Sequence, residues 1–487
     1  MSEYIFKTKP YEHQTIALKK SWNKEYYGFF MEMGTGKSKV LIDEIAALYL
    51  RGKITGALII APKGVYRNWE RGEIPTHMPD QVPYTIAAWK APSEMTIQDK
   101  KNLKEILEPN GKLRILLMNI EALSGLKGAK YAAMFLKKNN AMMAIDESTT
   151  IKTPNASRTK NTLKLASLAT YKRIMTGSPV TKNPLDIYSQ LDFLSPLILN
   201  QNYWAFRSRY AVMVRRNFGA RSTQLVVGFQ RIPELNTIIE QHSYRVLKED
   251  CLDLPDKVYQ RRFVSLTPEQ VKAYEEMRRF NLTEVEGRTM TSLSTLTALI
   301  RLHQISCGHI SFDDGETQAL KNNRMKELLD ILDETEGKVI IWASYRFDLR
   351  HITDALKEKF GENSCASYFG DTKDKDRQDI VEKFQDKNSE LKYFVGNPST
   401  GGYGLTLHAA HTVIYYSNTY DLEKRIQSED RVHRIGQTNK VTYIDLISEG
   451  TVDEKIVQSL RSKIDIATEV MGEQVKQWVI EPIRKRK

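Results

Sequence analysis

Short runs of consecutive apolar residues, separated by longer amphipathic stretches, recur along the chain. Strands buried on both faces of a parallel sheet have this continuous pattern, whereas strands with one exposed face alternate. Helical patterns such as Lys37–Leu50 and Arg324–Asp333 lie between the runs. The order predicts an α/β chain with two doubly wound parallel-sheet domains. The runs are Gly28–Met31, Ala57–Ile60, Arg114–Met118, Met142–Ile145, Arg173–Met175, Val339–Ala343, Tyr393–Val395, Val413–Tyr416 and Val441–Ile447.

The stretch from about Pro196 to Gln260 interrupts this alternation. It contains Tyr203-Trp204-Ala205-Phe206, and a helical region from Pro268 to about Cys307 follows it. We therefore predict a first lobe over 1–196, a basic and aromatic accessory insertion over 197–255, a helical region over 256–320 and a second lobe over 321–487. Five arginines of the insertion have no acidic residue among them: Arg207, Arg209, Arg215, Arg216 and Arg221.

The composition excludes several classes of protein. With 487 residues, 41% hydrophobic and 27% charged, the chain is not wholly disordered. It has no apolar run of about 18 residues and no apolar secretion signal among its first thirty residues, and its three cysteines lie far apart. We therefore expect a cytoplasmic protein with no membrane partner. The net charge of +12 favours a polyanionic partner, most often a nucleic acid.

The segment Met31-Glu32-Met33-Gly34-Thr35-Gly36-Lys37-Ser38 lies between a predicted strand and a predicted helix. Glycines let backbone N–H groups approach phosphates, and a helix N-terminus favours negative charge. Lys37 would reach the β- and γ-phosphates, and the Ser38 hydroxyl would bind Mg²⁺. Met31 stands where the strict phosphate-loop pattern has glycine, so a simple glycine turn before a helix is the alternative.

Two acidic residues follow another predicted strand. Asp146 and Glu147 come directly after the apolar run that ends at Ile145. In this arrangement Asp146 would hold Mg²⁺, and Glu147 would orient and deprotonate an attacking water. Two acids after a strand are also common surface residues, so the prediction depends on the phosphate loop upstream.

A pair of arginines lies near the C-terminus. Arg431 and Arg434 are three residues apart, so on a helix they would share a face. Two guanidinium groups there would stabilise charge that develops on a γ-phosphate. The alternatives are a solvated basic helix, or pairing of the arginines with Glu429 and Asp430.

In their order along the chain, these segments resemble those of superfamily 2 nucleic-acid motors, and within them the Swi/Snf-like ATPases. Ser148 and Thr149 depart from the usual Ala and His of that family, and Ser178 replaces a Thr. The segments that carry the resemblance are Pro10–Gln14, Met31–Ser38, Leu58–Trp69, Asp146–Lys152, Met175–Pro196, Tyr244–Lys257, Leu299–His309, Val339–Ser344, Ser399–Leu407 and Asp430–Gln437.

The resemblance implies two RecA-like lobes with ATP and Mg²⁺ bound where they meet. Ser38 and Asp146 would hold the metal. The residues expected to contact the nucleotide are Gln14, Gly34, Thr35, Gly36, Lys37 and Ser38. Those expected to act in catalysis are Lys37, Asp146, Glu147, Arg431 and Arg434. Those expected to contact DNA are Thr176, Ser178, Ser399, Thr400 and Gly401, with an accessory grip at Arg207, Arg215 and Arg216.

The function we expect is a DNA-dependent ATPase motor that translocates on duplex DNA. A strand-separating or strand-annealing helicase is the first alternative, and a nucleotide-gated DNA clamp without motor activity is the second. The chain could also supply motor power to replication, repair or restriction partners. His303, Cys307 and His309 lack a fourth ligand, so we expect no metal there, and we expect Trp69 to be a packing residue.

Overall fold

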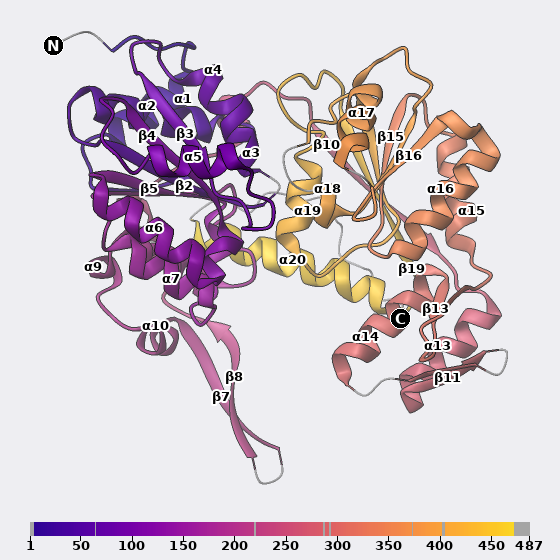
Figure 1. Cartoon of the computed structure of the whole chain (residues 1–487). Coiled ribbons are helices and arrows are strands. Elements are labelled where there is room, and N and C mark those ends of the chain that lie inside the picture. Colours follow the sequence, from indigo (N-terminus) through magenta and orange to yellow (C-terminus); the bar gives the residue numbers. More distant parts are fainter. Residues whose placement is uncertain are drawn as a thin grey trace. The chain divides into compact units, whose positions relative to one another are not determined.

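The computed structural model describes residues 4–63, 65–218, 221–285, 288–291, 294–372, 374–401 and 405–471 (Figure 1). Within these ranges the chain forms two compact units. Unit 1 consists of residues 4–252 and 465–471, and unit 2 consists of residues 253–464. Each unit is built on one large parallel sheet with apolar cores on both of its faces. The predicted fold class is therefore confirmed.

The helices alternate with the strands. Those of unit 1 are α1 (Glu12–Ser21), α2 (Lys37–Leu50), α3 (Tyr66–Asn68), α4 (Ile74–His77), α5 (Ile97–Glu105), α6 (Leu126–Lys138), α7 (Ser157–Ala166), α8 (Tyr188–Leu194), α9 (Pro196–Leu199), α10 (Tyr203–Tyr210), α11 (Ile232–His242) and α12 (Lys248–Cys251). The later helices are α13 (Pro268–Phe280), α14 (Thr295–Cys307), α15 (Asn323–Asp333), α16 (Arg346–Phe360), α17 (Asp374–Gln385), α18 (Pro398–Gly401), α19 (Leu422–Glu429) and α20 (Val452–Val470).

The sheet of unit 1 has the strand order β3-β4-β2-β5-β6-β1-β9, and every neighbouring pair is parallel. Along the central strand β5, Met143 and Ile145 pack on one face while Met142 and Ala144 pack on the other, which explains its unbroken apolar run. The strands are β1 (Tyr26–Met31), β2 (Gly56–Ala61), β3 (Tyr84–Ala88), β4 (Leu113–Asn119), β5 (Ala141–Asp146), β6 (Tyr171–Met175) and β9 (Ser243–Val246).

The sheet of unit 2 has the order β10-β19-β18-β15-β17-β16 and is also parallel throughout. On β15, Val339 and Ile341 face one core, and Ile340 and Trp342 face the other. The strands are β10 (Lys257–Val264), β15 (Lys338–Trp342), β16 (Cys365–Tyr368), β17 (Tyr393–Gly396), β18 (Ala410–Tyr415) and β19 (Val441–Ser448).

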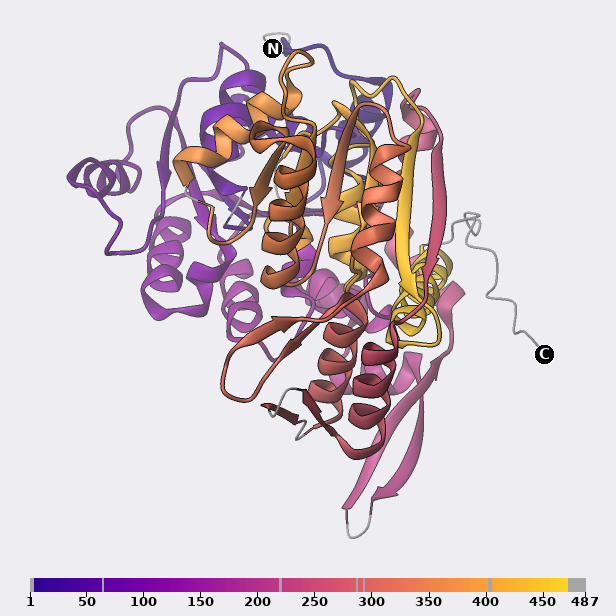
Figure 2. The ribbon, with the colours of Figure 1, turned by 90° about the vertical axis from the view of Figure 1, so that its right-hand side faces the viewer.

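The stretch 197–255 contributes to unit 1 in two ways. The strands β7 (Ala211–Phe218) and β8 (Arg221–Phe229) form an antiparallel hairpin that pairs with no other described strand. The hairpin extends away from the sheet of unit 1 (Figures 1 and 2). After it, α11 leads into β9, which pairs with β1. The sheet of unit 1 therefore continues past the predicted insertion.

The predicted helical region contains two helices, α13 and α14. The strands β11 (Leu282–Val285) and β12 (Arg288–Thr291) separate α13 from α14, and β13 (His309–Ser311) pairs with β14 (Thr317–Ala319). Among the described residues, no helix of either unit is long and apolar enough to cross a membrane.

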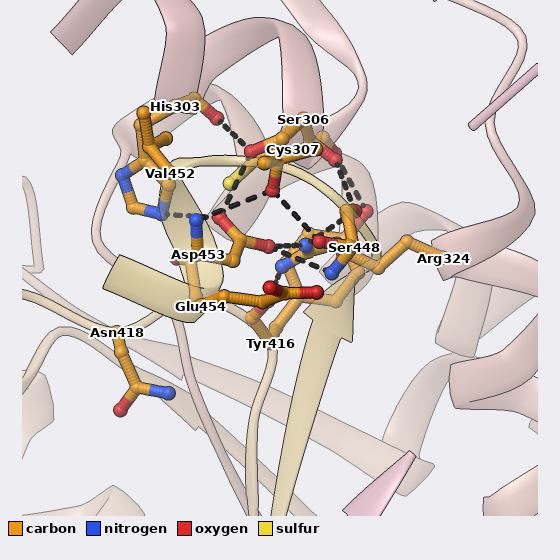
Figure 3. Close-up of polar contacts among 12 residues, drawn as sticks. His303, Ser306, Cys307, Arg324, Tyr416, Asn418, Ser448, Val452, Asp453 and Glu454 are labelled. Carbon is orange, nitrogen blue, oxygen red and sulfur yellow. Dashed lines mark hydrogen bonds and ion pairs between the residues drawn. The ribbon is translucent and has the colours of Figure 1, made fainter. Parts of the chain in front are cut away.

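A buried ionic network joins this helical region to the sheet of unit 2 (Figure 3). The guanidinium of Arg324 on α15 pairs with the Asp453 carboxylate at the start of α20 and donates to Ser448 Oγ at 2.8 Å. Ser306 Oγ on α14 donates to Asp453 at 2.9 Å, and His303 Nε2 lies 3.4 Å from the same carboxylate. Burial opposes ionisation of Asp453, but Arg324 and His303 outweigh it and lower its pKa.

His303 and His309, at which we expect no metal, lie in this network and in a neighbouring contact. His303 Nδ1 lies 2.8 Å from the Tyr345 hydroxyl, and His309 Nδ1 lies 2.8 Å from Asp348. Across the described ranges, no group of His, Cys, Asp or Glu side chains has a metal-binding arrangement. These histidines are buried partners of carboxylates and a tyrosine.

Candidate nucleotide and nucleic-acid sites

The loop between β1 and α2 has the backbone of a phosphate loop. Gly34 and Gly36 have φ values of 85° and 84°, which favour glycine. A Cβ atom on Gly36 would lie 2.1 Å from Gln14 Nε2, so no larger residue fits without movement. Gly36 is also the N-cap of α2, and the first N–H groups of that helix therefore face the loop.

Gln14, the predicted adenine-reading residue, lies directly against this loop. Its amide Nε2 donates to the Thr35 carbonyl at 3.0 Å, and its Oε1 accepts from the Tyr11 N–H at 3.0 Å. His13 Nε2 lies 2.8 Å from the same Thr35 carbonyl. The structure therefore brings α1 and the phosphate loop together through two neighbouring side chains.

Lys37 lies across the loop that precedes it. Its Nζ donates to the carbonyls of Met31 at 2.8 Å and Glu32 at 3.2 Å. The side chain is 9% exposed, so its charge lies in a region of low solvent access. A buried ammonium on the first residue of a helix is suited to a phosphate ligand, because the helix N-terminus also favours negative charge.

Asp146 ends β5 near Lys37. Burial raises the pKa of Asp146, while the Lys37 charge and a hydrogen bond from Trp69 oppose that rise. Trp69 Nε1 donates to Asp146 Oδ2 at 3.0 Å, and the indole is 1% exposed. Trp69 is thus a packing residue, as predicted, but it also orients the carboxylate.

The donor set fits Mg²⁺. A hydroxyl such as that of Ser38 and a carboxylate such as that of Asp146 are the hard oxygen donors that this ion prefers. The buried Lys37 ammonium acts electrostatically on Asp146, and its charge also suits phosphate groups.

Glu147 has a strained backbone. Its φ is 59°, a value that residues other than glycine rarely adopt. Thr176 Oγ1 donates to Glu147 Oε1 at 3.4 Å, and Thr176 is fully buried. In this conformation the Thr176 hydroxyl is turned toward the candidate catalytic acid and not toward solvent, where a nucleic acid would lie.

The segment that contains Ser178 packs against the phosphate loop. A Cβ atom on Gly177 would lie 3.2 Å from the Met33 nitrogen. Arg245 Nη1 donates to the Gly177 carbonyl at 2.7 Å and to the Phe30 carbonyl at 3.1 Å. Ser178 itself is partly buried, and its N–H donates to Thr176 Oγ1 at 3.2 Å.

Ser148, one of the departures from the family pattern, has an internal partner. Its hydroxyl donates to Gln190 Oε1 at 2.6 Å, and Gln190 Nε2 donates to the Pro179 carbonyl at 2.8 Å. Lys152 Nζ donates to Thr181 Oγ1 at 2.6 Å. Hydrogen bonds therefore link the segment Asp146–Lys152 to the segment Met175–Pro196.

In unit 2, the prediction that Arg431 and Arg434 lie on a helix is wrong. The helix α19 ends at Glu429, and both arginines lie in the turns that follow. After them, the Gln437 amide donates to the carbonyls of His408 and Ala410, so this part of the chain contacts the start of β18.

The two guanidinium groups nevertheless converge. Arg431 Nη1 and Arg434 Nη1 both donate to the Leu405 carbonyl, at 3.4 and 3.2 Å. Arg431 is buried and Arg434 is partly buried. The Leu407 N–H returns a hydrogen bond to the Arg431 carbonyl at 2.9 Å. The arginine pair therefore packs directly against the backbone of Leu405 and Leu407.

The predicted DNA-contacting residues of unit 2 follow Pro398 in α18. Ser399 is exposed, and its N–H donates to Asn397 Oδ1 at 2.8 Å. The backbones of Thr400 and Gly401 complete this short helix, whereas residues 402–404 lie outside the described residues.

Arg425 is a residue that sequence reasoning missed. Its guanidinium donates to Glu429 Oε1 at 2.8 Å and to Asp445 Oδ1 at 2.5 Å, and it stacks over Tyr415 at 3.6 Å from the ring centroid. Glu429 also accepts from the Tyr259 hydroxyl at 2.8 Å. This buried cluster holds the end of α19, from which the arginine turns begin. No spacing rule distinguishes Arg425 from the surrounding charged residues.

The predicted accessory grip is divided between two elements. On α10, Phe206 and Tyr210 are buried in the core, as expected of an ordinary packing helix, while Trp204 is 61% exposed with the Arg207 guanidinium 5.6 Å from its ring centroid. Arg215 and Arg216 lie on β7 and are exposed. Arg207 therefore lies on a helix, and Arg215 and Arg216 lie on a strand.

The chain matches two known protein families. Residues 22–310 match the SNF2-related domain, and residues 321–436 match the helicase conserved C-terminal domain. A solved structure of the Sulfolobus solfataricus SWI2/SNF2 ATPase core in complex with dsDNA is 23% identical, with a TM-score of 0.43, and the match covers 97% of this chain and 94% of that one.

Curated relatives match along almost the whole chain. An uncharacterized ATP-dependent helicase of Mycoplasma pneumoniae is 27% identical over 91% of this chain and 40% of its own length. The transcription regulatory protein SNF2 of Saccharomyces cerevisiae is 27% identical over 90% of this chain and 26% of its own length. The putative ATP-dependent helicase/translocase YwqA of Bacillus subtilis is 27% identical over 92% of this chain and 47% of its own length. The chain thus spans from about a quarter to about half of these relatives.

Proposed function

Because this chain belongs to the SNF2-related family of ATP-dependent helicases, we propose that it hydrolyses ATP in a DNA-dependent reaction and translocates along duplex DNA. The observation that carries the proposal is the phosphate loop of unit 1. There, Gln14, Lys37 and Asp146 gather around two glycines with positive φ. The cytoplasmic location stays a prediction.

In the proposed reaction, the loop N–H groups and Lys37 bind the β- and γ-phosphates, and Gln14 contacts the adenine. Mg²⁺, when bound, neutralises phosphate charge and is held by Ser38 and Asp146. Glu147 orients the attacking water and accepts its proton. Arg431 and Arg434 supply guanidinium groups that stabilise charge on the γ-phosphate.

We place Thr176 as a link between the nucleotide and DNA sites, since its buried hydroxyl contacts Glu147. Ser178, Ser399, Thr400 and Gly401 are proposed to contact DNA phosphates, because a motor that steps along any sequence needs contacts that do not read bases. The hydrogen bonds among Leu405, Arg431 and Arg434 support direct coupling between a DNA-contacting segment and the arginine pair.

A phosphate-release assay with and without duplex DNA tests the ATPase proposal. We expect stimulation by DNA in the unchanged protein and loss of turnover in Lys37→Ala. Arg434→Ala should lower turnover by about 10³-fold or more, because an arginine finger contributes about 10³–10⁵, while ATP binding remains. Lys440→Ala, at an exposed pair with Asp256, is the matched control. Normal turnover in Arg434→Ala would contradict the assigned role.

A triplex-displacement assay beside a fork-unwinding assay tests the motor proposal. Displacement without unwinding is the expected result for duplex translocation. Unwinding without displacement would instead establish the strand-separating alternative, and ATP-dependent DNA retention with neither activity would establish the clamp.

A further inference from the structure

The β7–β8 hairpin has no core of its own. Its base is fixed, because Tyr210 and Ala211 are buried and Gln230 N donates to the Tyr210 carbonyl at 2.9 Å. The Arg209 guanidinium, just before the hairpin, pairs with both carboxylate oxygens of Glu234 at 2.8 Å. An isolated two-stranded ribbon is marginally stable, so a firmly fixed base with an exposed stem indicates a surface kept for a partner.

The charge of this region has one sign. No acidic residue occurs from 193 to 233, a stretch that holds six arginines. Arg209 and Arg231 lie within reach of Glu234, at 2.8 and 4.0 Å, but Arg215 and Arg216 have no carboxylate near them on either described strand. The stem therefore complements a polyanion.

The register places the two stem arginines on opposite faces. Consecutive residues of a strand point to opposite sides, so Arg215 and Arg216 cannot share a face. Arg215 is opposite Gln224 and Arg216 is opposite Thr223, and these four residues are exposed. Each face therefore carries one guanidinium beside a neutral side chain that can form hydrogen bonds.

We propose that the β7–β8 hairpin enters a groove of duplex DNA, with Arg215 and Arg216 contacting phosphates on opposite walls of the groove. The major groove of B-form DNA, roughly 12 Å wide, admits a two-stranded ribbon. A single strand lying along the hairpin would engage only one face, and the deep, narrow major groove of duplex RNA admits no ribbon. This inference rests on the proposed function and names the surface through which the motor holds a groove of the duplex.

The test is direct binding of the full chain to duplex DNA, single-stranded DNA and duplex RNA at several salt concentrations, without nucleotide. Each phosphate contact contributes about 0.9 to the slope of log affinity against log salt. We expect Arg215→Gln and Arg216→Gln each to reduce the duplex-DNA slope by about 1, and the double variant by about 2. Lys112→Gln, an exposed lysine of unit 1, is the control, and thermal midpoints verify folding.

Three results would overturn the inference. Unchanged slopes would show that the hairpin does not hold DNA. A change in only one single variant would show that one face alone is used. An equal reduction of the slope on single-stranded DNA or duplex RNA would show that the hairpin does not bind in a groove of duplex DNA. If the unchanged protein shows DNA-stimulated ATPase in any of these cases, the proposed function stands while the hairpin's role fails. If DNA does not stimulate the ATPase, the binding slopes still show whether the hairpin binds duplex DNA.

Discussion

At the scale of single residues, Gly36 carries two constraints that alanine cannot satisfy together. Its φ of 84° disfavours any Cβ atom, and that atom would also lie 2.1 Å from Gln14 Nε2. The conformation and the close approach come from different parts of the chain, one from the turn into α2 and the other from α1. The local motif predicts the turn but not the contact.

We expect Gly36→Ala to weaken ATP binding by tenfold or more, because Gln14 or the loop must move. Gly52 provides a matched control: its φ is 65°, but a Cβ atom on it would have no other atom within 4 Å. Gly52→Ala should lower stability by about 1 kcal/mol from backbone strain and leave ATP affinity unchanged. Titration with a fluorescent ATP analogue measures both variants, and equal affinities would contradict the steric account.

Trp69 gives a second prediction at this scale. Trp69→Phe retains most of the packing but removes the N–H that orients Asp146. Loss of a residue that orients a metal ligand typically weakens metal affinity 10–100-fold. We therefore expect the Mg²⁺ concentration for half-maximal ATPase to rise about tenfold, with turnover recovering at saturating Mg²⁺. Trp22→Phe, at an indole that contacts Arg51, is the control; a similar Mg²⁺ requirement in both variants would leave Trp69 a packing residue only.

At the scale of elements, strands with unbroken apolar runs were predictable, and those with mixed composition were not. The pattern identifies β5 and β15 because both of their faces are buried. It misses β3, β9, β10 and β16, the edge strands of the two sheets. These strands are only partly buried, so their sequences mix apolar and polar residues. The turns after α19 are held by contacts with residues distant in sequence, such as Leu405, His408 and Ala410, so no local pattern predicts them.

The residues of the candidate site also fall into two groups, those that a local sequence pattern identifies and those that only distant contacts define. Glycines, Lys37 and the Asp146–Glu147 pair could be predicted, because their chemistry requires particular residue types in sequence. The contacts of Trp69 and Arg425 depend on residues far along the chain, so no local pattern contains them. Register likewise could not be predicted for β7–β8, and it is the register that places its arginines on two faces.

The network around Asp453 yields a pH prediction for unit 2. Burial lowers the pKa of His303, although Asp453 partly offsets this effect. The unfolded histidine takes up a proton near pH 6.5 and the folded one does so only at lower pH. The contribution of neutral His303 to the free energy of unfolding is therefore fully present above about pH 6.5, and it is lost as the pH falls toward the pKa of the folded state. We expect His303→Gln to flatten the decline in thermal midpoint between pH 7.5 and 5.5, compared with the same substitution at the distant His351. Identical pH profiles would contradict this assignment.

At the scale of the whole molecule, each unit has its own apolar cores. Gln14, Lys37 and Asp146 all belong to unit 1, so a bound nucleotide analogue without DNA should stabilise that unit. Ile340 is fully buried in unit 2, and Ile340→Ala should lower stability there by about 2–5 kcal/mol. We expect two calorimetric transitions, one raised by the analogue and the other lowered by Ile340→Ala. A single transition that responds to both would contradict this prediction.

The pairing of β10 with β19 has a consequence for biosynthesis. β10 is the first strand of its sheet to leave the ribosome, yet its hydrogen-bonded neighbour is the last. Until translation has passed Ser448, the nascent chain holds β10 without its partner, and contacts so distant in sequence form slowly. Premature termination before β19 would therefore leave an unpaired strand edge open to aggregation, so chaperones that shield such edges would act during the final part of synthesis.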